Sequence, residues 1–386
     1  TLNMGYQTDT MDKSTFATYQ KEYGAGYGKY YEDPSGFFLY RDVNGDGNSE
    51  LVVPFSEDAS QGAKFDPSLM VYHWDAFDPS SPNYKKQRPW VAADNDPSAF
   101  FQTGKTSNIS LAIDRQSDKG YFKFGYGKTS QTGILPNSEI TKDFLNFGAS
   151  YKLTDKLTFS SSINVTKLEA LGRYGTGYDD KNMMQGFRQW WQVNVDLKEQ
   201  QAAYERSGKN VTWNWSDPTN LTPIYTDNPY FNRYENYQND ERLRYFGYAT
   251  LNYQATDWMT ISARASIDTY EEIQEERDAI GSHAPSSYTR YNHGFSEYNY
   301  NLTATFQKDI NEDISFTGLL GANSRLATNN SIYAATNGGL LLPGVYSIFN
   351  TQNPINAPAE NYDQLKVVGI FANASFAYKK MLFLEA

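Results

Sequence analysis

Residues 298–307 read YNYNLTATFQ, and in this stretch apolar and polar side chains alternate without a break. Leu302, Ala304 and Phe306 fall on one side of an extended chain, whereas Thr303 and Thr305 fall on the other. A period of two with one apolar face predicts a β-strand in a two-sided sheet. The same alternation recurs in 145–153 and in 258–269. The chain is therefore expected to be all-β.

Strand length favours a membrane barrel over a soluble β-sandwich, which would show the same alternation. The alternating segments run for about ten to sixteen residues, against about five or six for a usual strand. Tyr and Trp gather at the segment ends, as in the aromatic girdles of membrane barrels; examples are Tyr245, Tyr253, Trp258 and Tyr270. We expect Leu302 and Ala304 to face the lipid bilayer and Thr303 and Thr305 to face the lumen.

Tight reversals alternate with long excursions along 145–379. The reversals fall at 154–156, 256–257, 311–313 and 379–380, and the excursions at 168–240, 272–294 and 328–362. This asymmetry is typical of outer-membrane barrels, which have short periplasmic turns and long extracellular loops. About eleven strands are expected, half of a barrel of about 22 strands. They are 1–9, 107–115, 120–128, 143–153, 157–167, 242–254, 258–271, 295–308, 313–327, 364–378 and 380–386.

Composition limits the alternatives. The chain has 386 residues, 39% hydrophobic and 16% aromatic, with a net charge of -11 and no cysteine. Such an acidic chain is not expected to bind nucleic acid, which a basic patch would recognise. No apolar run reaches the length of a transmembrane helix, about eighteen residues or more. The absence of cysteine excludes disulfides and thiolate metal sites.

Several segments resemble the SusC/RagA family of TonB-dependent outer-membrane transporters of Bacteroidetes. They are YQKEYGAGYG (19–28), WVAADNDPSAFFQTG (90–104), GYDDKNMMQGFRQWWQVNVDLKEQ (177–200), KNVTWNWSD (209–217), the run from DNPYFNRY to SIDTY (227–270) and EERDAIGS (275–282). The resemblance covers nearly the whole chain. It corresponds to the barrel immediately after the plug domain, so the signal peptide, TonB box, plug and second half of the barrel are expected to lie outside this sequence.

The resemblance implies active import of an oligomeric nutrient, a glycan or a peptide, across the outer membrane. It implies a SusD-like surface lipoprotein as partner, and a TonB complex that acts through the absent N-terminal region. Segments 10–106 and 168–240 would be long extracellular loops, and the lipoprotein would cover their rim. Neither an enzymatic activity nor an organic cofactor is expected.

A separate motif at 42–50 suggests a calcium site. Oxygen donors recur there at the spacing of a calcium-binding loop, with Gly47 at the sharp turn; the donors are Asp42, Asn44, Asp46, Asn48 and Glu50. The helix-flanked form of such a loop needs Glu three residues later, where Val53 stands, and the flanking segments resemble strands. The alternative is a hairpin turn that needs no metal, because Asn, Gly and Asp suit tight turns.

The loop 168–240 contains a group of residues that could face a ligand or partner: Arg188, Trp190, Trp191, Trp213, Trp215 and Tyr230. Exposed aromatic rings stack on sugars, but a structured loop this long also requires a packing core of its own. Two further classes of function were considered. One is a secreted all-β calcium-containing glycan-binding module. The other is a surface hydrolase, for which His73, His283 and His293 form no catalytic triad in the sequence.

Overall fold

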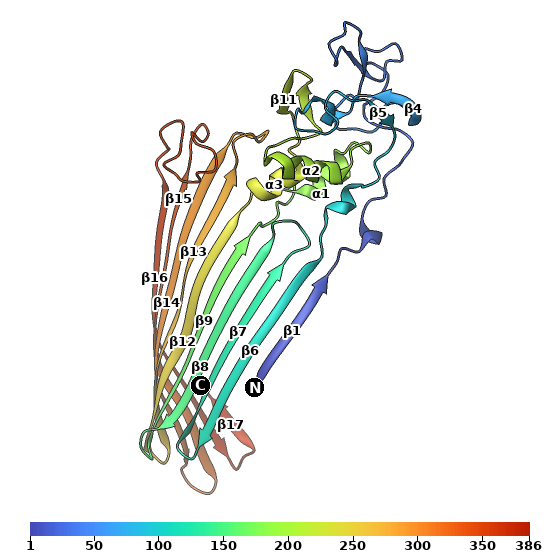
Figure 1. Cartoon of the computed structure of the whole chain (residues 1–386). Coiled ribbons are helices and arrows are strands. Elements are labelled where there is room, and N and C mark those ends of the chain that lie inside the picture. Colours follow the sequence, from blue (N-terminus) through green and yellow to red (C-terminus); the bar gives the residue numbers. More distant parts are fainter.

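The computed structural model describes residues 1–386. It shows a tall curved wall of strands with a folded cap at one end (Figure 1). Eleven strands form one antiparallel sheet, and their order in the sheet is their order along the chain. They are β1 (Leu2–Asp9), β6 (Gly104–Ser117), β7 (Gly120–Thr132), β8 (Glu139–Lys152), β9 (Leu157–Leu171), β12 (Asn239–Thr256), β13 (Met259–Asp278), β14 (Ser287–Asp309), β15 (Ile314–Ala335), β16 (Ala359–Tyr378) and β17 (Leu382–Glu385). All eleven predicted strands are therefore present.

The register of the sheet gathers most apolar residues on one face, although Val367 and Phe371 of β16 lie on the other. Leu302 lies opposite Ala263 of β13 and Ala322 of β15, and Ala304 lies opposite Ile261. Because side chains alternate along a strand, a slip by one residue would mix the two faces. The register instead matches the apolar positions of neighbouring strands, so the period of two in the sequence becomes a continuous apolar surface.

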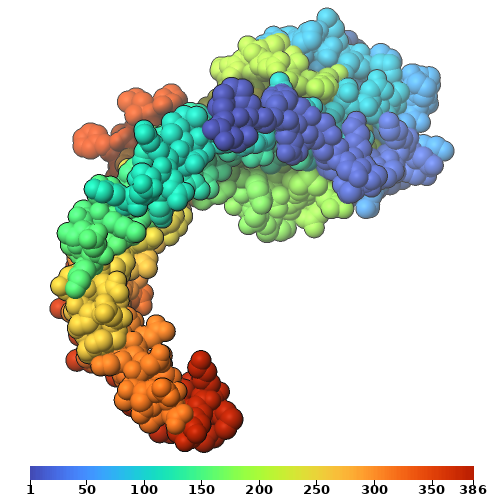
Figure 2. Space-filling view, turned by 90° about the horizontal axis from the view of Figure 1, so that it is seen from below, coloured from blue at the N-terminus to red at the C-terminus, as the bar shows by residue number.

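This apolar surface lies on the convex side of the wall. Viewed along the strands, the sheet traces an open arc with the cap at its N-terminal end, and β1 and β17 form the two edges (Figure 2). Side chains spread apart on a convex face and crowd together on a concave one. Along β12, Leu243, Tyr245 and Leu251 are exposed, whereas Arg244 and Phe246 on the other face are half-buried. The polar face is therefore concave.

Amides and ion pairs link neighbouring strands on the concave face. Asn323 donates a hydrogen bond to Asn299 at 2.6 Å and another to Asn301 at 2.7 Å. Arg244 makes two hydrogen bonds to Asp268, at 2.8 and 2.6 Å. The face opposite the apolar surface is thus lined by paired polar groups.

Short turns occupy one end of the wall and long loops the other, as predicted. The turns are 118–119, 153–156, 257–258, 310–313 and 379–381, and the loops are 10–103, 133–138, 172–238, 279–286 and 336–358. The predicted excursions 272–294 and 328–362 were too long, because β13 and β14 stay paired up to Asp278 and Ser287, and β15 and β16 stay paired up to Tyr333 and Ala359. There, charged and polar residues occupy both faces, so the apolar period disappears although the ladder continues.

The two longest loops contain short elements of their own. They are the strands β2 (Leu39–Arg41), β3 (Glu50–Val52), β4 (Asp66–Val71), β5 (Arg88–Trp90), β10 (Trp215–Asp217) and β11 (Asn220–Pro223), the helices α1 (Met183–Gln189), α2 (Leu197–Ser207) and α3 (Pro229–Glu235), and the 3₁₀ turns Lys13–Thr15, Trp74–Phe77 and Pro97–Phe100. The side chain of Asp196 caps the first turn of α2, and Gly208 ends it in a left-handed conformation. None of these helices is long and apolar enough to cross a membrane.

Loops 10–103 and 172–238 fold together as one unit, which we call the cap. Its main apolar cluster contains Trp74 and Phe55 from the first loop and Trp213 and Trp215 from the second. The indole of Trp215 donates to the carbonyl of Trp74 at 2.9 Å. The main buried core of this chain therefore lies in the cap, since the wall exposes both of its faces.

Arg233 of α3 fastens the cap to the end of the wall. Its guanidinium is buried and donates to the carbonyls of Pro136, Asn137, Gly172 and Arg173 at 2.9, 3.2, 2.6 and 3.4 Å. These carbonyls follow β7 and β9, the strands on either side of β8. Burial lowers the pKa of Arg233 to about 10, so the group stays charged at neutral pH. It has no carboxylate partner, and backbone carbonyls alone offset its charge.

Replacing Arg233 with Met should loosen the cap without unfolding the wall. The variant keeps most of the buried volume but leaves four carbonyls without their donor, a loss of about 3 kcal/mol. Limited proteolysis should cut the 172–182 segment at least about tenfold faster in Arg233→Met than in the wild type. The exposed Arg188→Met variant is the matched control and should be cut at the wild-type rate. Equal rates in all three proteins would refute the anchoring role.

Candidate functional site

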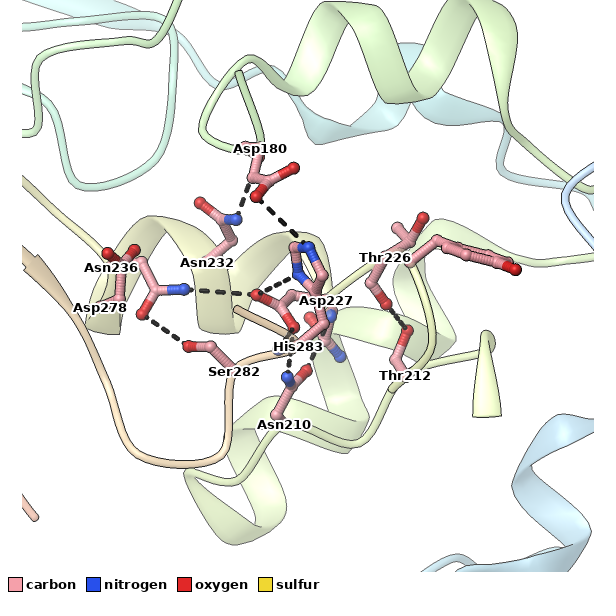
Figure 3. A network of polar contacts seen from close by, with 12 residues as sticks. Asp180, Asn210, Thr212, Thr226, Asp227, Asn232, Asn236, Asp278, Ser282 and His283 are labelled. Carbon is pink, nitrogen blue, oxygen red and sulfur yellow. Dashed lines mark hydrogen bonds and ion pairs between the residues drawn. The ribbon is translucent and has the colours of Figure 1, made fainter. Parts of the chain in front are cut away.

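The cap contains a cavity of about 400 Å³ where three loops meet. The first long loop contributes Asp58, the second contributes Tyr178 and Asp180, and the β13–β14 loop contributes His283. Figure 3 shows the polar part of this site, in which His283 lies between Asp180 and Asp227. Residues that are far apart in the sequence therefore line the same cavity.

One side of the cavity is aromatic. Phe187 and Trp191 are 2% and 6% exposed and belong to the cap core, so this part of the lining is fixed. Tyr178 and Tyr225 are 82% and 64% exposed, and Trp190 is half-buried. The cavity thus combines a rigid apolar base with accessible aromatic rings.

Asp227 is held in place by hydrogen bonds from the second long loop and from the β13–β14 loop. Its Oδ1 accepts from Asn210 Nδ2 at 2.7 Å and from the backbone N–H of His283 at 2.8 Å. Its Oδ2 accepts from Asn236 Nδ2 at 3.3 Å. Asn236 in turn accepts from Ser282. This buried carboxylate therefore ties the β13–β14 loop to the cap.

His283 is held as an imidazolium. Its Nε2 lies 3.3 Å from Asp180 Oδ2, and its Nδ1 lies 3.5 Å from Asp227 Oδ2. Hydrogen bonding to Asp180, and then to Asp227, raises the pKa of His283 to about 10. A histidine that is already protonated at neutral pH cannot serve as a general base. No serine or cysteine lines the cavity beside His283, so the lining contains no Ser–His or Cys–His pair.

The residues predicted to face a ligand or partner divide into two groups. Trp213, Trp215 and Tyr230 are 0%, 3% and 5% exposed and pack in the cap core, as the packing alternative describes. Their rings offer no face to a ligand in this structure. Trp190 and Trp191 line the cavity, whereas Arg188 is exposed outside it.

Sequence reasoning did not assign five of the lining residues to a common site: Tyr178, Asp180, Tyr225, Asp227 and His283. Tyr178 and Asp180 lie in a segment quoted above for its family resemblance, but nothing in that segment shows what faces it. Contacts such as that between Asp180 and His283 join different loops. A pattern confined to one short segment cannot reveal them.

The predicted calcium loop lies elsewhere in the cap, between β2 and β3, so its flanks are strands as expected. The carboxylate of Asp42 accepts the backbone N–H groups of residues 45, 46 and 47 at 2.7, 3.2 and 2.9 Å. Glu50 accepts from Asn44 Nδ2 at 2.6 Å and from Val43 N at 3.0 Å. No cluster of three or more His, Cys, Asp or Glu side chains is arranged to hold a metal. Calcium binding stays a prediction.

Comparison with known proteins shows that the fold is similar to that of solved structures. No protein-family model matches the chain, and no curated protein matches it. The RagAB peptide importer in its closed-closed state matches with a TM-score of 0.56 at 13% identity, over 74% of this chain and 31% of that chain. Its open-open state matches with a TM-score of 0.54 at 14% identity, over the same shares. The chain thus spans less than a third of the importer chain, and about three quarters of it has a fold similar to that part.

The ion pairs of His283 make cap stability depend on pH. The folded-state pKa of about 10 lies above the ordinary histidine value of 6.5. Stabilisation by the charged imidazolium is therefore complete below about pH 6.5 and is lost as pH rises through about 10. His283→Gln should lower cap stability by about 2 kcal/mol at pH 6. Thermal unfolding of the two proteins should converge above about pH 10; a difference that is independent of pH would contradict this.

The calcium loop can be tested against the metal-free turn. If Asp42, Asp46 and Glu50 bind calcium, about 1 mM of the ion should protect residues 40–60 of the wild type from proteolysis. Asp46→Ala should lose this protection while the wall keeps its stability, because the loop is far from the sheet. If calcium gives the wild type no more protection than a chelator does, the hairpin is a turn held by its own hydrogen bonds.

Proposed function

We propose that this chain forms half of the barrel wall of a TonB-dependent outer-membrane importer of oligomeric nutrients. The observation that carries the proposal is the continuous apolar face of the eleven-stranded wall. On that face Ile370, Val368 and Leu302 are 82%, 66% and 55% exposed. A surface of this extent is unfavourable in water and favourable against lipid. The concave polar face would then line the lumen.

The cap end of the wall would be extracellular, and we propose that a SusD-like lipoprotein docks there. Support comes from the β15–β16 loop, where Leu341, Leu342 and Phe349 are 61%, 59% and 95% exposed. Asn350 holds this loop through bonds to the backbone of Leu341, Leu342 and Val345. A rigid, water-exposed apolar tip suits contact with another protein. Energy coupling to TonB would act through parts of the transporter outside this chain.

The substrate class in this proposal is a peptide or a glycan. RagAB, which has a similar fold, is named a peptide importer. A secreted, calcium-containing glycan-binding module is the second candidate, favoured by the β2–β3 hairpin motif. It leaves the apolar face unexplained, because a secreted module would bury such a surface. A surface hydrolase has no support in the cavity, since His283 is already paired with two carboxylates.

Charge placed on the two faces of β14 tests the membrane assignment. Ala304→Arg would put a cation against lipid and should destabilise the folded barrel by about 2 to 4 kcal/mol near mid-depth. Thr305→Arg, its neighbour on the concave face, should cost much less. Folding of the full transporter into lipid vesicles, monitored by protease resistance, measures both. Equal tolerance of the two substitutions, or a wild type recovered in the soluble fraction, would contradict the proposal.

Purification in mild detergent tests the partner. A surface lipoprotein should copurify in about equal amounts with the wild type. Phe349→Asp should reduce its recovery by about tenfold, because a charge would replace a ring at the contact. Recovery of the transporter without a stoichiometric companion would argue against the docked lipoprotein.

A further inference from the structure

The cap cavity has an excess of negative charge. Asp58, Asp180 and Asp227 line it, His283 is the one cationic residue in the lining, and no lysine or arginine contributes. His283 is already paired with Asp180 and Asp227. Asp58 is therefore the one carboxylate of the lining that does not contact the imidazolium.

The cavity lining also contains hydrogen-bond acceptors that have no donor, beside one buried donor without an acceptor, Trp191 Nε1. Asp58 accepts from the hydroxyl of Tyr27 through one oxygen, which leaves its second oxygen free. Asp180 uses Oδ2 toward His283, and its Oδ1 has no partner. Asn232 is 3% exposed, and its buried Oδ1 also has no hydrogen-bond partner. A buried acceptor without a donor is costly, so these three acceptors favour a ligand group that donates.

Accessible aromatic rings complete the site. Tyr178, Tyr225 and Trp190 line the cavity but pack against no other aromatic ring and carry no cation of this chain. Their π-faces are electron-rich and attract cations. The guanidinium of arginine has only donors and is planar, so it can bond to a carboxylate and stack on a ring at the same time.

We propose that the cap cavity binds a cationic side chain of a peptide, with arginine preferred over lysine. Asp58 would receive the guanidinium, and Tyr178 would stack on it. The volume of about 400 Å³ falls within the usual range of small-ligand pockets. Use of this site in substrate capture rests on the proposed import function, whereas the binding itself does not.

A neutral sugar fits the lining less well. Sugar hydroxyl groups both donate and accept, and a neutral ring would leave the charge of Asp58 unpaired while displacing its water. Stacking on Tyr178 would be available to both ligands. The negative charge of the lining therefore decides in favour of the cation.

The test compares two capped peptides, Ala-Ala-Arg-Ala-Ala and the same peptide with citrulline, which keeps the shape of arginine without its charge. Calorimetric titration of the full transporter in detergent at low salt should show about tenfold tighter binding of the arginine peptide. Asp58→Asn should remove most of this preference and leave the citrulline affinity unchanged. Tyr178→Leu should weaken the arginine peptide by at least about threefold.

The control variant is Asp114→Asn, which removes an exposed carboxylate from β6 of the wall and should bind like the wild type. Equal affinity for the two peptides, absence of binding by the arginine peptide, or an unchanged preference in Asp58→Asn would each overturn the inference. Displacement of the arginine peptide by a neutral maltooligosaccharide would also overturn it. Membrane insertion of the same protein is measured separately, so failure here leaves the barrel assignment untouched.

Discussion

The backbone ladder of the eleven-stranded sheet is the constraint on which the rest of the structure depends. Each inner strand pairs with its neighbours in the chain on both sides, so the backbone groups are satisfied strand by strand. Because side chains alternate, this ladder sorts apolar residues onto the convex face and polar residues onto the concave face. It also sends every second connection to the same end of the wall. The asymmetry between turns and loops follows directly.

The cap is a consequence of that asymmetry. Loops 10–103, 172–238 and 279–286 follow β1, β9 and β13 and lie at the same rim of the wall. The first two loops share a buried core. Arg233 then joins the cap to the backbone beyond β7 and β9. A close approach is needed there: a Cβ on Gly172 would lie 1.6 Å from the carbonyl oxygen of Asn137. The cavity exists because these loops are held together, and its charge comes from residues of all three.

The sequence predicted the wall well and the cap poorly, for a physical reason. A strand with one apolar face repeats every second residue, so segments such as 298–307 reveal their structure locally. The upper part of β13 was missed because Glu271 and Glu275 occupy positions of the apolar face while the pairing with β14 continues. The cap follows no period, and its contacts span long separations, such as that from Trp74 to Trp215. Trp213 and Trp215 were candidates for ligand or partner contact, with a packing core as the alternative, and only their packing partners show that they are buried.

The central claim is that the convex face of the wall meets lipid and the concave face meets water. Nitroxide labels placed singly at residues 298–307 of β14, in the transporter reconstituted into a bilayer, test it most directly. The account predicts alternation: high oxygen accessibility at Tyr300, Leu302 and Ala304, and high accessibility to a water-soluble nickel reagent at Asn301, Thr303 and Thr305. Alternation of the opposite sign, or uniform access of the nickel reagent at every position, would contradict it.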